Sequence, residues 1–163
     1  MRNTLLLLLA FAALGQRRLP PPQKIPVQPI AYSHRQHIAL GLQCKDCHTN
    51  PDPGDFMGLP QVSKCMSCHK SMKTDSPEIQ KLAEFAANNR QPPWVRIYRI
   101  PDYVFFSHRA HLAAGAGCET CHGPVRERDQ LWREVGVSMG DCMDCHRANK
   151  ASLDCSYCHD PRN

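Results

Sequence analysis

The sequence predicts a small, mostly irregular fold with short α-helices, held together by something other than a core of apolar side chains. The chain has 163 residues, including 10 Cys and 14 Pro, but only 2 Trp, 4 Tyr and 5 Phe. A domain of this size ordinarily buries about two thirds of its unfolded surface, and this inventory is poor for that purpose. Disulfides, metals or cofactors must therefore supply the missing cohesion.

Every cysteine belongs to one pattern, C-x-x-C-H, which occurs five times. Two thiols three positions apart lie on one side of a helical turn. They can add to the two vinyl groups of one haem, and the His that follows can then bind the iron. We predict five covalently bound c-type haems, attached at Cys44 and Cys47, Cys65 and Cys68, Cys118 and Cys121, Cys142 and Cys145, and Cys155 and Cys158. The proximal iron ligands are His48, His69, His122, His146 and His159.

Zinc sites and disulfide scaffolds explain this pattern less well. A zinc site uses two C-x-x-C pairs, or one pair with a distant pair of His. A disulfide framework suits an exported chain with an even number of Cys. Neither chemistry requires a His directly after every pair, so haem attachment is the preferred interpretation.

Four further histidines form two His-x-x-His pairs, each just before a haem motif: His34 with His37, and His108 with His111. Residues three apart on a helix project from neighbouring turns on nearly one face. The alternative is that they are ordinary surface histidines. With five irons to saturate, we predict that they are distal ligands, which makes those haems electron carriers without an open position for substrate.

Five irons need five distal ligands, and only four His remain. Met is the usual alternative, and Met66 and Met143 lie inside haem motifs while Met1 lies at the N-terminus. The candidates are Met57, Met72 and Met139, each of which also has an ordinary role as a gap filler. The fifth iron could instead remain open.

The chain contains an internal duplication. Residues 33–48 and 107–122 align without a gap and are identical at 9 of 16 positions, and each is followed by a second motif. We predict a dihaem module at residues 30–73, a second at 102–147 and an appended fifth haem motif at 148–163. The haem-cored fold class is thus a multihaem cytochrome c with two repeated dihaem modules plus a fifth haem.

The segment at residues 74–101 has a different character. Ser76 can cap a helix that has Pro77 at its first position, and Ile79, Leu82, Ala83 and Phe85 give this helix an apolar face. Pro92-Pro93 is expected to end it. The alternation from Trp94 to Ile100 predicts a short strand.

The N-terminus predicts export. Arg2 precedes an apolar run from Leu5 to Leu14, which is typical of a signal peptide at residues 1–15 or of a short uncleaved anchor. A Pro-rich leader at 16–29 follows. We expect the protein to be periplasmic, or membrane-associated on the periplasmic side. The formal net charge of +5 is too small to indicate nucleic-acid binding.

Several segments resemble a known family. Trp94-Val95-Arg96, the stretch from Ile100 to Val104, residues 107–122, Gly58-Leu59-Pro60 and Ser138-Met139-Gly140 resemble the pentahaem cytochrome subunit of bacterial alternative complex III, a quinol:electron-acceptor oxidoreductase. More distantly, the chain is similar to the cytochrome c3 and c7 group. The resemblance implies redox protein partners in a membrane quinol-oxidising complex with iron–sulfur and quinol-binding subunits, and it favours Met139 as the fifth distal ligand.

Three functions follow from these expectations. The first is an electron-transfer subunit that is part of, or docked to, such a membrane complex, and the second is a free periplasmic electron shuttle. The third, a multihaem reductase for a small oxyanion, needs an open iron, and the ligand count permits one at most. We predict no catalytic residues in the chain itself.

Overall fold

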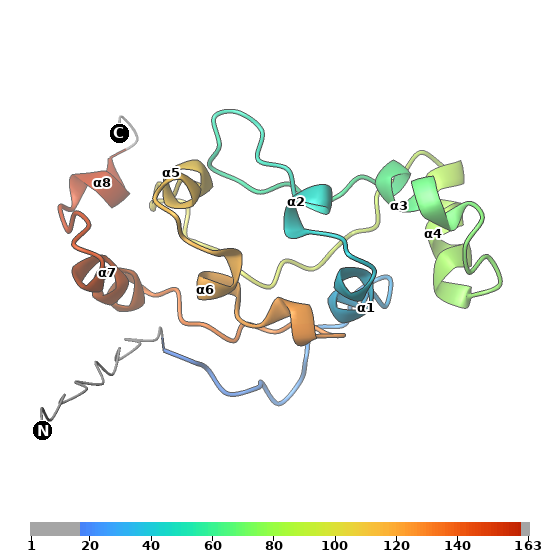
Figure 1. The fold of residues 1–163 in the computed structure, drawn as a ribbon, viewed down its shortest axis with the longest axis horizontal. Helices are drawn as coiled ribbons and strands as arrows, with labels where there is room; N and C mark the ends of the chain where they lie inside the picture. The colour runs from blue at the N-terminus through green and yellow to red at the C-terminus, as the bar shows by residue number, and fades with distance from the viewer. Residues whose placement is uncertain (1–16, 161–163) are drawn as a thin grey trace, which may run out of the picture.

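The computed structural model describes residues 17–160, so the predicted export signal lies outside the described part. In this part, long irregular segments join eight short α-helices and one 3-10 turn. The body is elongated, with α4 near one end and α7 and α8 at the other (Figure 1). The elements are α1 (His34–Ala39), α2 (Cys44–Cys47), α3 (Val62–His69), α4 (Pro77–Ala87), α5 (His108–Ala113), α6 (Cys118–His122), η1 (Val125–Glu127), α7 (Met139–Ala148) and α8 (Ser156–His159).

The short helices coincide with the predicted haem chemistry. The five motifs lie on or at the ends of α2, α3, α6, α7 and α8, while α1 and α5 carry the two His-x-x-His pairs. Ser33 and Ser107 cap α1 and α5 in the same way, since each hydroxyl accepts the backbone N–H three residues on, at 3.1 and 3.3 Å. The duplication in sequence is therefore a duplication of local structure, as the fold class predicted.

The helix predicted after Ser76 is confirmed as α4, with Pro77 in its first turn. Leu82 is buried with Ile30 and Val62, and Ile79 and Phe85 pack against this cluster. The helix ends at Ala87, before Pro92-Pro93, because Asn88 leaves helical geometry and Asn89 adopts a positive φ of 50°. The apolar face of α4 thus packs against α3, and it closes one end of the molecule.

The strand predicted from Trp94 to Ile100 is wrong. No residue from 94 to 100 is in a strand, and the β pairing in the described residues is one isolated bridge between Arg18 and Val135. The Gln28 side-chain amide replaces a partner strand: it donates to the carbonyl of Val95 and accepts from its N–H, both at 2.9 Å. An alternating pattern needs a neighbouring backbone to become a strand, and here a side chain occupies that place.

The Pro-rich leader is attached to the body at its start. The N–H of Leu19 donates to the carbonyl of Glu134 at 2.7 Å, and the N–H of Gly136 donates to the carbonyl of Arg17 at 2.9 Å. Val135, between these two partners, is fully buried. In residues 17–160, no helix combines the length and the apolar character needed to span a membrane.

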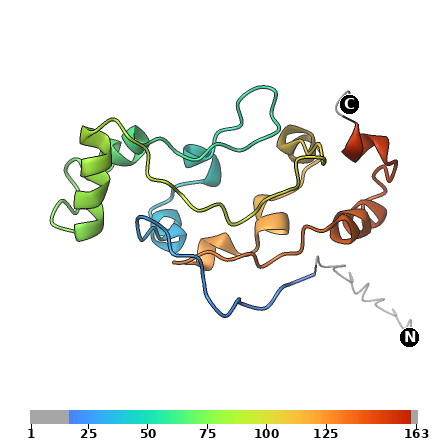
Figure 2. The same cartoon turned by 180° about the vertical axis from the view of Figure 1, so that it is seen from behind.

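The two modules hold each other through equivalent arginines. Arg109 of α5 forms an ion pair with Asp52, which follows the first motif. Arg35, its counterpart in α1, forms an ion pair with Asp129, which follows the third motif, and the N–H of Arg35 donates to the carbonyl of Arg128 at 3.0 Å. Each His-x-x-His helix therefore docks on a loop of the other module, as the close approach of α1 and η1 shows (Figure 2).

Candidate haem-binding sites

The described chain has very little side-chain core. Its buried hydrophobic residues are Ile30, Val62, Leu82 and Val135. Large apolar side chains remain exposed along the body, among them Leu40, Phe56, Met72, Tyr103 and Tyr157. Planar apolar cofactors would cover such side chains, so this surface fits bound haem. The ten cysteines are all free, as covalent attachment requires.

The structure brings each His of the two pairs to the His of one haem motif. The ring-centre distances are 6.4 Å for His34 and His48, 6.1 Å for His37 and His69, 6.5 Å for His108 and His122, and 6.0 Å for His111 and His146. Two imidazoles on opposite sides of one metal ion, with metal–nitrogen bonds of about 2 Å, have ring centres about 6 Å apart. Each spacing therefore fits one iron between two histidines.

Ring orientation separates the four pairs into two classes. The planes are nearly parallel in His34–His48 and His108–His122, at 8° and 7°. They are tilted in His37–His69 and His111–His146, at 64° and 48°. The first His of each His-x-x-His pair thus faces the nearer motif and the second faces the following one, in both modules.

Seven of the nine histidine rings place Nδ1 against a backbone carbonyl. A carbonyl oxygen only accepts hydrogen bonds, so Nδ1 carries the proton and Nε2 keeps its lone pair for a metal. This is the arrangement that orients histidine ligands in metal sites. The bonds run from His37 to Ser33, His48 to Gly58, His69 to Met72, His108 to Asp55, His111 to Ser107, His146 to Ser152 and His159 to Tyr103, at 2.6 to 3.1 Å.

His34 and His122 are held by packing. Nδ1 of His34 is buried and has no partner in residues 17–160. Burial, together with the neighbouring His48 and His37, lowers the pKa of His34 to about 4. Burial likewise lowers the pKa of His122, with His108 and His48 adding to the effect. Both rings are therefore neutral near pH 7, the form that binds a metal.

Aromatic residues fix the distal rings, which the sequence analysis missed. Tyr32 stacks on His37 at 4.4 Å and meets His34 edge-on at 4.8 Å. Phe106 holds His111 and His108 in the same way, at 4.4 and 4.8 Å. An aromatic residue directly before Ser33 and Ser107 is a repeat signal one position outside the 16-residue alignment.

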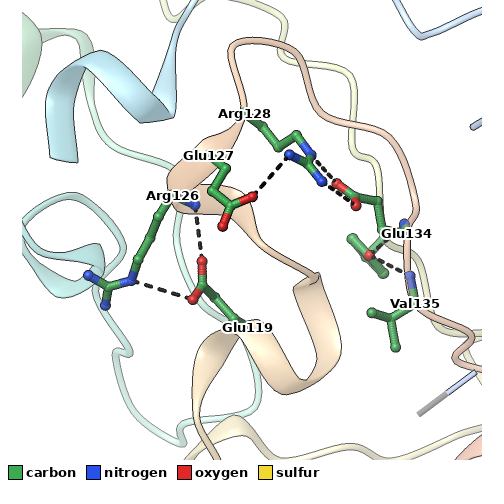
Figure 3. A network of polar contacts seen from close by, with 7 residues as sticks. Glu119, Arg126, Glu127, Arg128, Glu134 and Val135 are labelled. Carbon is green, nitrogen blue, oxygen red and sulfur yellow. Dashed lines mark hydrogen bonds and ion pairs between the residues drawn. The ribbon is translucent and has the colours of Figure 1, made fainter. Parts of the chain in front are cut away.

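An ion-pair network supports the third motif. Arg128 forms two hydrogen bonds with the buried Glu134, at 2.8 and 3.0 Å, and Arg126 pairs with Glu119 inside the motif at 3.5 Å (Figure 3). The hydrogen bonds that Arg128 donates to the Glu134 carboxylate raise the pKa of Arg128. The backbone N–H of Glu134 donates to the hydroxyl of Tyr98, whose ring meets His122 edge-on at 4.7 Å. The network thus positions the ring that orients His122.

The fifth motif lacks a His partner. His159 is exposed, and in the described chain its ring neighbour is Tyr103, stacked at 6.1 Å. Met139 is 63% exposed and lies in the first turn of α7, three residues before Cys142. Met57 and Met72 lie beside carbonyls that bind His48 and His69, since Gly58 follows Met57 and Met72 itself accepts from His69. These two methionines therefore lie next to motifs that already have a His partner.

The thiols of successive motifs influence each other electrostatically in one order. Burial raises the pKa of Cys65, and Cys47 raises it further. Burial and then Cys44 raise the pKa of Cys118. Burial raises the pKa of Cys121, and Cys145 raises it further. Burial also raises the pKa of Cys142, and the neighbours that add to this effect include Cys121 and Cys158. The motifs therefore follow each other as second, first, third, fourth and fifth, the order of α3, α2, α6, α7 and α8 along the body (Figure 1).

Comparison with known proteins agrees with this geometry. Residues 36–95 match the family model of cytochrome c3, and residues 104–160 match that of cytochrome c7 and related cytochrome c. A curated relative, the multiheme cytochrome c subunit of menaquinone reductase from Nitratidesulfovibrio vulgaris strain Hildenborough, is 29% identical over 160 residues. The similarity covers 81% of this chain and 76% of that protein.

The two family matches fall on the two repeated halves and include all five C-x-x-C-H motifs, together with His37, His108 and His111. An irregular chain with short helices, little side-chain core and paired histidines has the architecture that these matches describe. The chain is accordingly a small multihaem cytochrome c that carries electrons on covalently bound c-type haem.

Proposed function

We propose that this chain binds five haems and conducts electrons along its length for a quinone-linked membrane complex. The observation that carries the proposal is the four histidine pairs, whose spacing fits one iron each. Cys44 to Cys158 attach the haems in motif order, and haem 1 to haem 5 are named here by that order. His48, His69, His122, His146 and His159 are the proximal ligands, and His34, His37, His108 and His111 are the distal ligands of haems 1, 2, 3 and 4.

Bound haem supplies a one-electron carrier at each motif. The chain's own residues set the path, because the thiols of consecutive motifs in the order 2–1–3–4–5 are neighbours. Two histidines on one iron leave no position for a substrate. Residues of both modules thus favour conduction between the α4 end and the α8 end of the body.

Met139 is the proposed distal ligand of haem 5. It lies one helical turn before Cys142, whose neighbour is Cys158 of the fifth motif. A Cβ added to the following Gly140 would meet only the Ser138 hydroxyl, at 3.8 Å, so the backbone here is open to approach. The exposure of His159 supports a fifth haem that a partner protein can reach.

The proposed class of redox partner rests on the similarity to other proteins. The named relative is a subunit of a menaquinone reductase, and the sequence resembles the pentahaem subunit of a quinol:electron-acceptor oxidoreductase. Both assemblies exchange electrons with quinone. We infer a periplasmic location, with this chain attached to or docked on a quinol-oxidising membrane complex that has iron–sulfur and quinol-binding subunits. A free shuttle is the alternative.

Five haem additions are expected on the purified protein. Expression in a host with c-type cytochrome maturation should give an intact mass that exceeds the polypeptide by five haems, since every motif has both thiols free. Cys155→Ala with Cys158→Ala should remove exactly one haem and leave four. A mass without haem, or zinc in elemental analysis, would contradict the proposal.

Replacing a distal histidine should change the EPR signal of one haem, and the angle between the two axial ring planes predicts which signal changes. Near-parallel axial rings give rhombic low-spin EPR spectra, while strongly tilted rings give more axial ones with a larger highest g value. His34→Ala or His108→Ala should convert one haem with a rhombic signal to high spin. His37→Ala or His111→Ala should convert one haem with a more axial signal to high spin. Gln36→Ala, on the same helix as His34, is the matched control, because the side chain of Gln36 is exposed. Unchanged spectra in all four variants would make these histidines ordinary surface residues.

Met139→Ala should remove a His/Met signature. Wild-type oxidised protein is expected to show a near-infrared His/Met charge-transfer band, and the variant should lose it and lower one redox potential, because a thioether stabilises ferrous iron. Met57→Ala and Met72→Ala are controls that should keep the band. Loss of the band in a control instead of in Met139→Ala would reassign the ligand. Rapid cyanide or nitrite binding by wild type without such a band would favour the reductase.

Association with a membrane complex is tested in the native host. Affinity purification of a C-terminally tagged chain from detergent-solubilised membranes should recover iron–sulfur and quinol-binding subunits, and quinol addition should reduce its haems. A tagged unrelated periplasmic cytochrome provides the control. Recovery of the chain alone in the soluble periplasmic fraction, with no reduction by quinol in membranes, would support the free shuttle.

A further inference from the structure

The loop of residues 50–58 binds ligand histidines from both modules. The carbonyl of Gly58 accepts from Nδ1 of His48 at 2.9 Å, and the carbonyl of Asp55 accepts from Nδ1 of His108 at 2.7 Å. His48 belongs to the first motif, whereas His108 pairs with His122 of the third. One short loop therefore orients the proximal ligand proposed for haem 1 and the distal ligand proposed for haem 3.

Asn50 gives the 50–58 loop its shape. Its side-chain amide donates to the carbonyl of Gly54 at 2.8 Å and to that of Phe56 at 2.9 Å. Phe56 lies between Asp55 and Gly58, so the amide fixes the backbone from which both carbonyls project. Gly54 cannot be replaced by a larger residue without strain. It is buried, has a φ of +99°, and would place an added Cβ 2.6 Å from the Arg109 side chain.

The other module has no equivalent of this loop. Residues 123–129 follow the third motif and contact α1 through Asp129, which pairs with Arg35 and accepts from Ser33 at 2.6 Å. Yet Nδ1 of His34, the counterpart of His108, has no partner among residues 17–160. The two modules therefore differ in how they orient these rings. Loop 50–58 accepts hydrogen bonds from two ligand rings, whereas loop 123–129 holds α1 without contacting Nδ1 of His34.

We propose that Asn50 is a positioning residue that sets the redox potentials of haems 1 and 3 together, which rests on the proposed haem ligation. A hydrogen bond from Nδ1–H to a carbonyl makes Nε2 a stronger donor to iron. A stronger donor stabilises ferric iron and lowers the potential. These two haems are adjacent in the proposed conduction order, because the thiols of Cys44 and Cys118 are neighbours. The loop keeps their potentials matched across the junction between the modules.

Asn50→Ala in the haem-loaded protein tests this proposal. It should raise two of the five potentials in a redox titration, those of the two haems with rhombic low-spin EPR signals, and leave the other three unchanged. All haems should stay low-spin, because the ligands themselves remain. The matched control is Asn88→Ala, since Asn88 also donates its amide to a backbone carbonyl, that of Glu84 at 2.8 Å, but lies at the C-terminal end of α4, outside the loops that bind the ligand histidines.

Each outcome decides the matter. A shift of one potential, or a uniform shift of all five, would overturn the shared role, and so would an equal effect in Asn88→Ala. If Asn50→Ala does not mature, Asn50→Asp removes both donated hydrogen bonds while keeping the side-chain size, and it should give the same paired shift. The haem count and the EPR spectrum of the wild-type protein are measured first. If they differ from five haems with the expected low-spin signals, the proposed haem ligation is wrong. If they agree but Asn50→Ala does not shift two potentials, only the proposed role of Asn50 is wrong.

Discussion

Hydrogen bonds from histidine Nδ1 to backbone carbonyls are the interaction on which this structure depends. Seven rings are held in this way. Each bond fixes a tautomer and a ring direction at once, so Nε2 is left for the metal. Because the acceptors are main-chain carbonyls, the backbone of the irregular segments must be positioned accurately enough to form these hydrogen bonds. This explains how a chain with so few buried apolar side chains can still prescribe accurate geometry.

The duplication gives both halves the same local elements, and each half is held by contacts with the other. Both halves use the same cap, the same His-x-x-His helix and the same aromatic stack, from Tyr32 in one and Phe106 in the other. The equivalent arginines exchange partners, so each half needs the loops of the other. These exposed ion pairs are individually weak. Their value is geometric, because they hold the ligand helices against the loops that follow the haem motifs.

The elongated shape is suited to conduction. The motifs succeed one another along the long axis, and α4 and α8 mark opposite ends (Figures 1 and 2). At the α4 end a small apolar cluster of Ile30, Val62 and Leu82 completes the body. At the other end His159 is exposed and has an aromatic neighbour in place of a second histidine. The two ends therefore differ in packing and in the ring that faces the motif histidine, which is His37 for His69 and Tyr103 for His159.

The sequence by itself determined the local chemistry, because haem attachment and helix capping depend on neighbours in the chain. The haem attachment at Cys44 and Cys47 with His48, and the helix after Ser76, could both be predicted from adjacent residues, although the Ser76 side chain makes no capping hydrogen bond. Tertiary structure alone decided which histidine faces which, and that Asp55 orients His108, because these contacts join residues 14 to 53 positions apart. It also decided against the strand at residues 94–100, since pairing depends on what lies alongside, and there the Gln28 amide does.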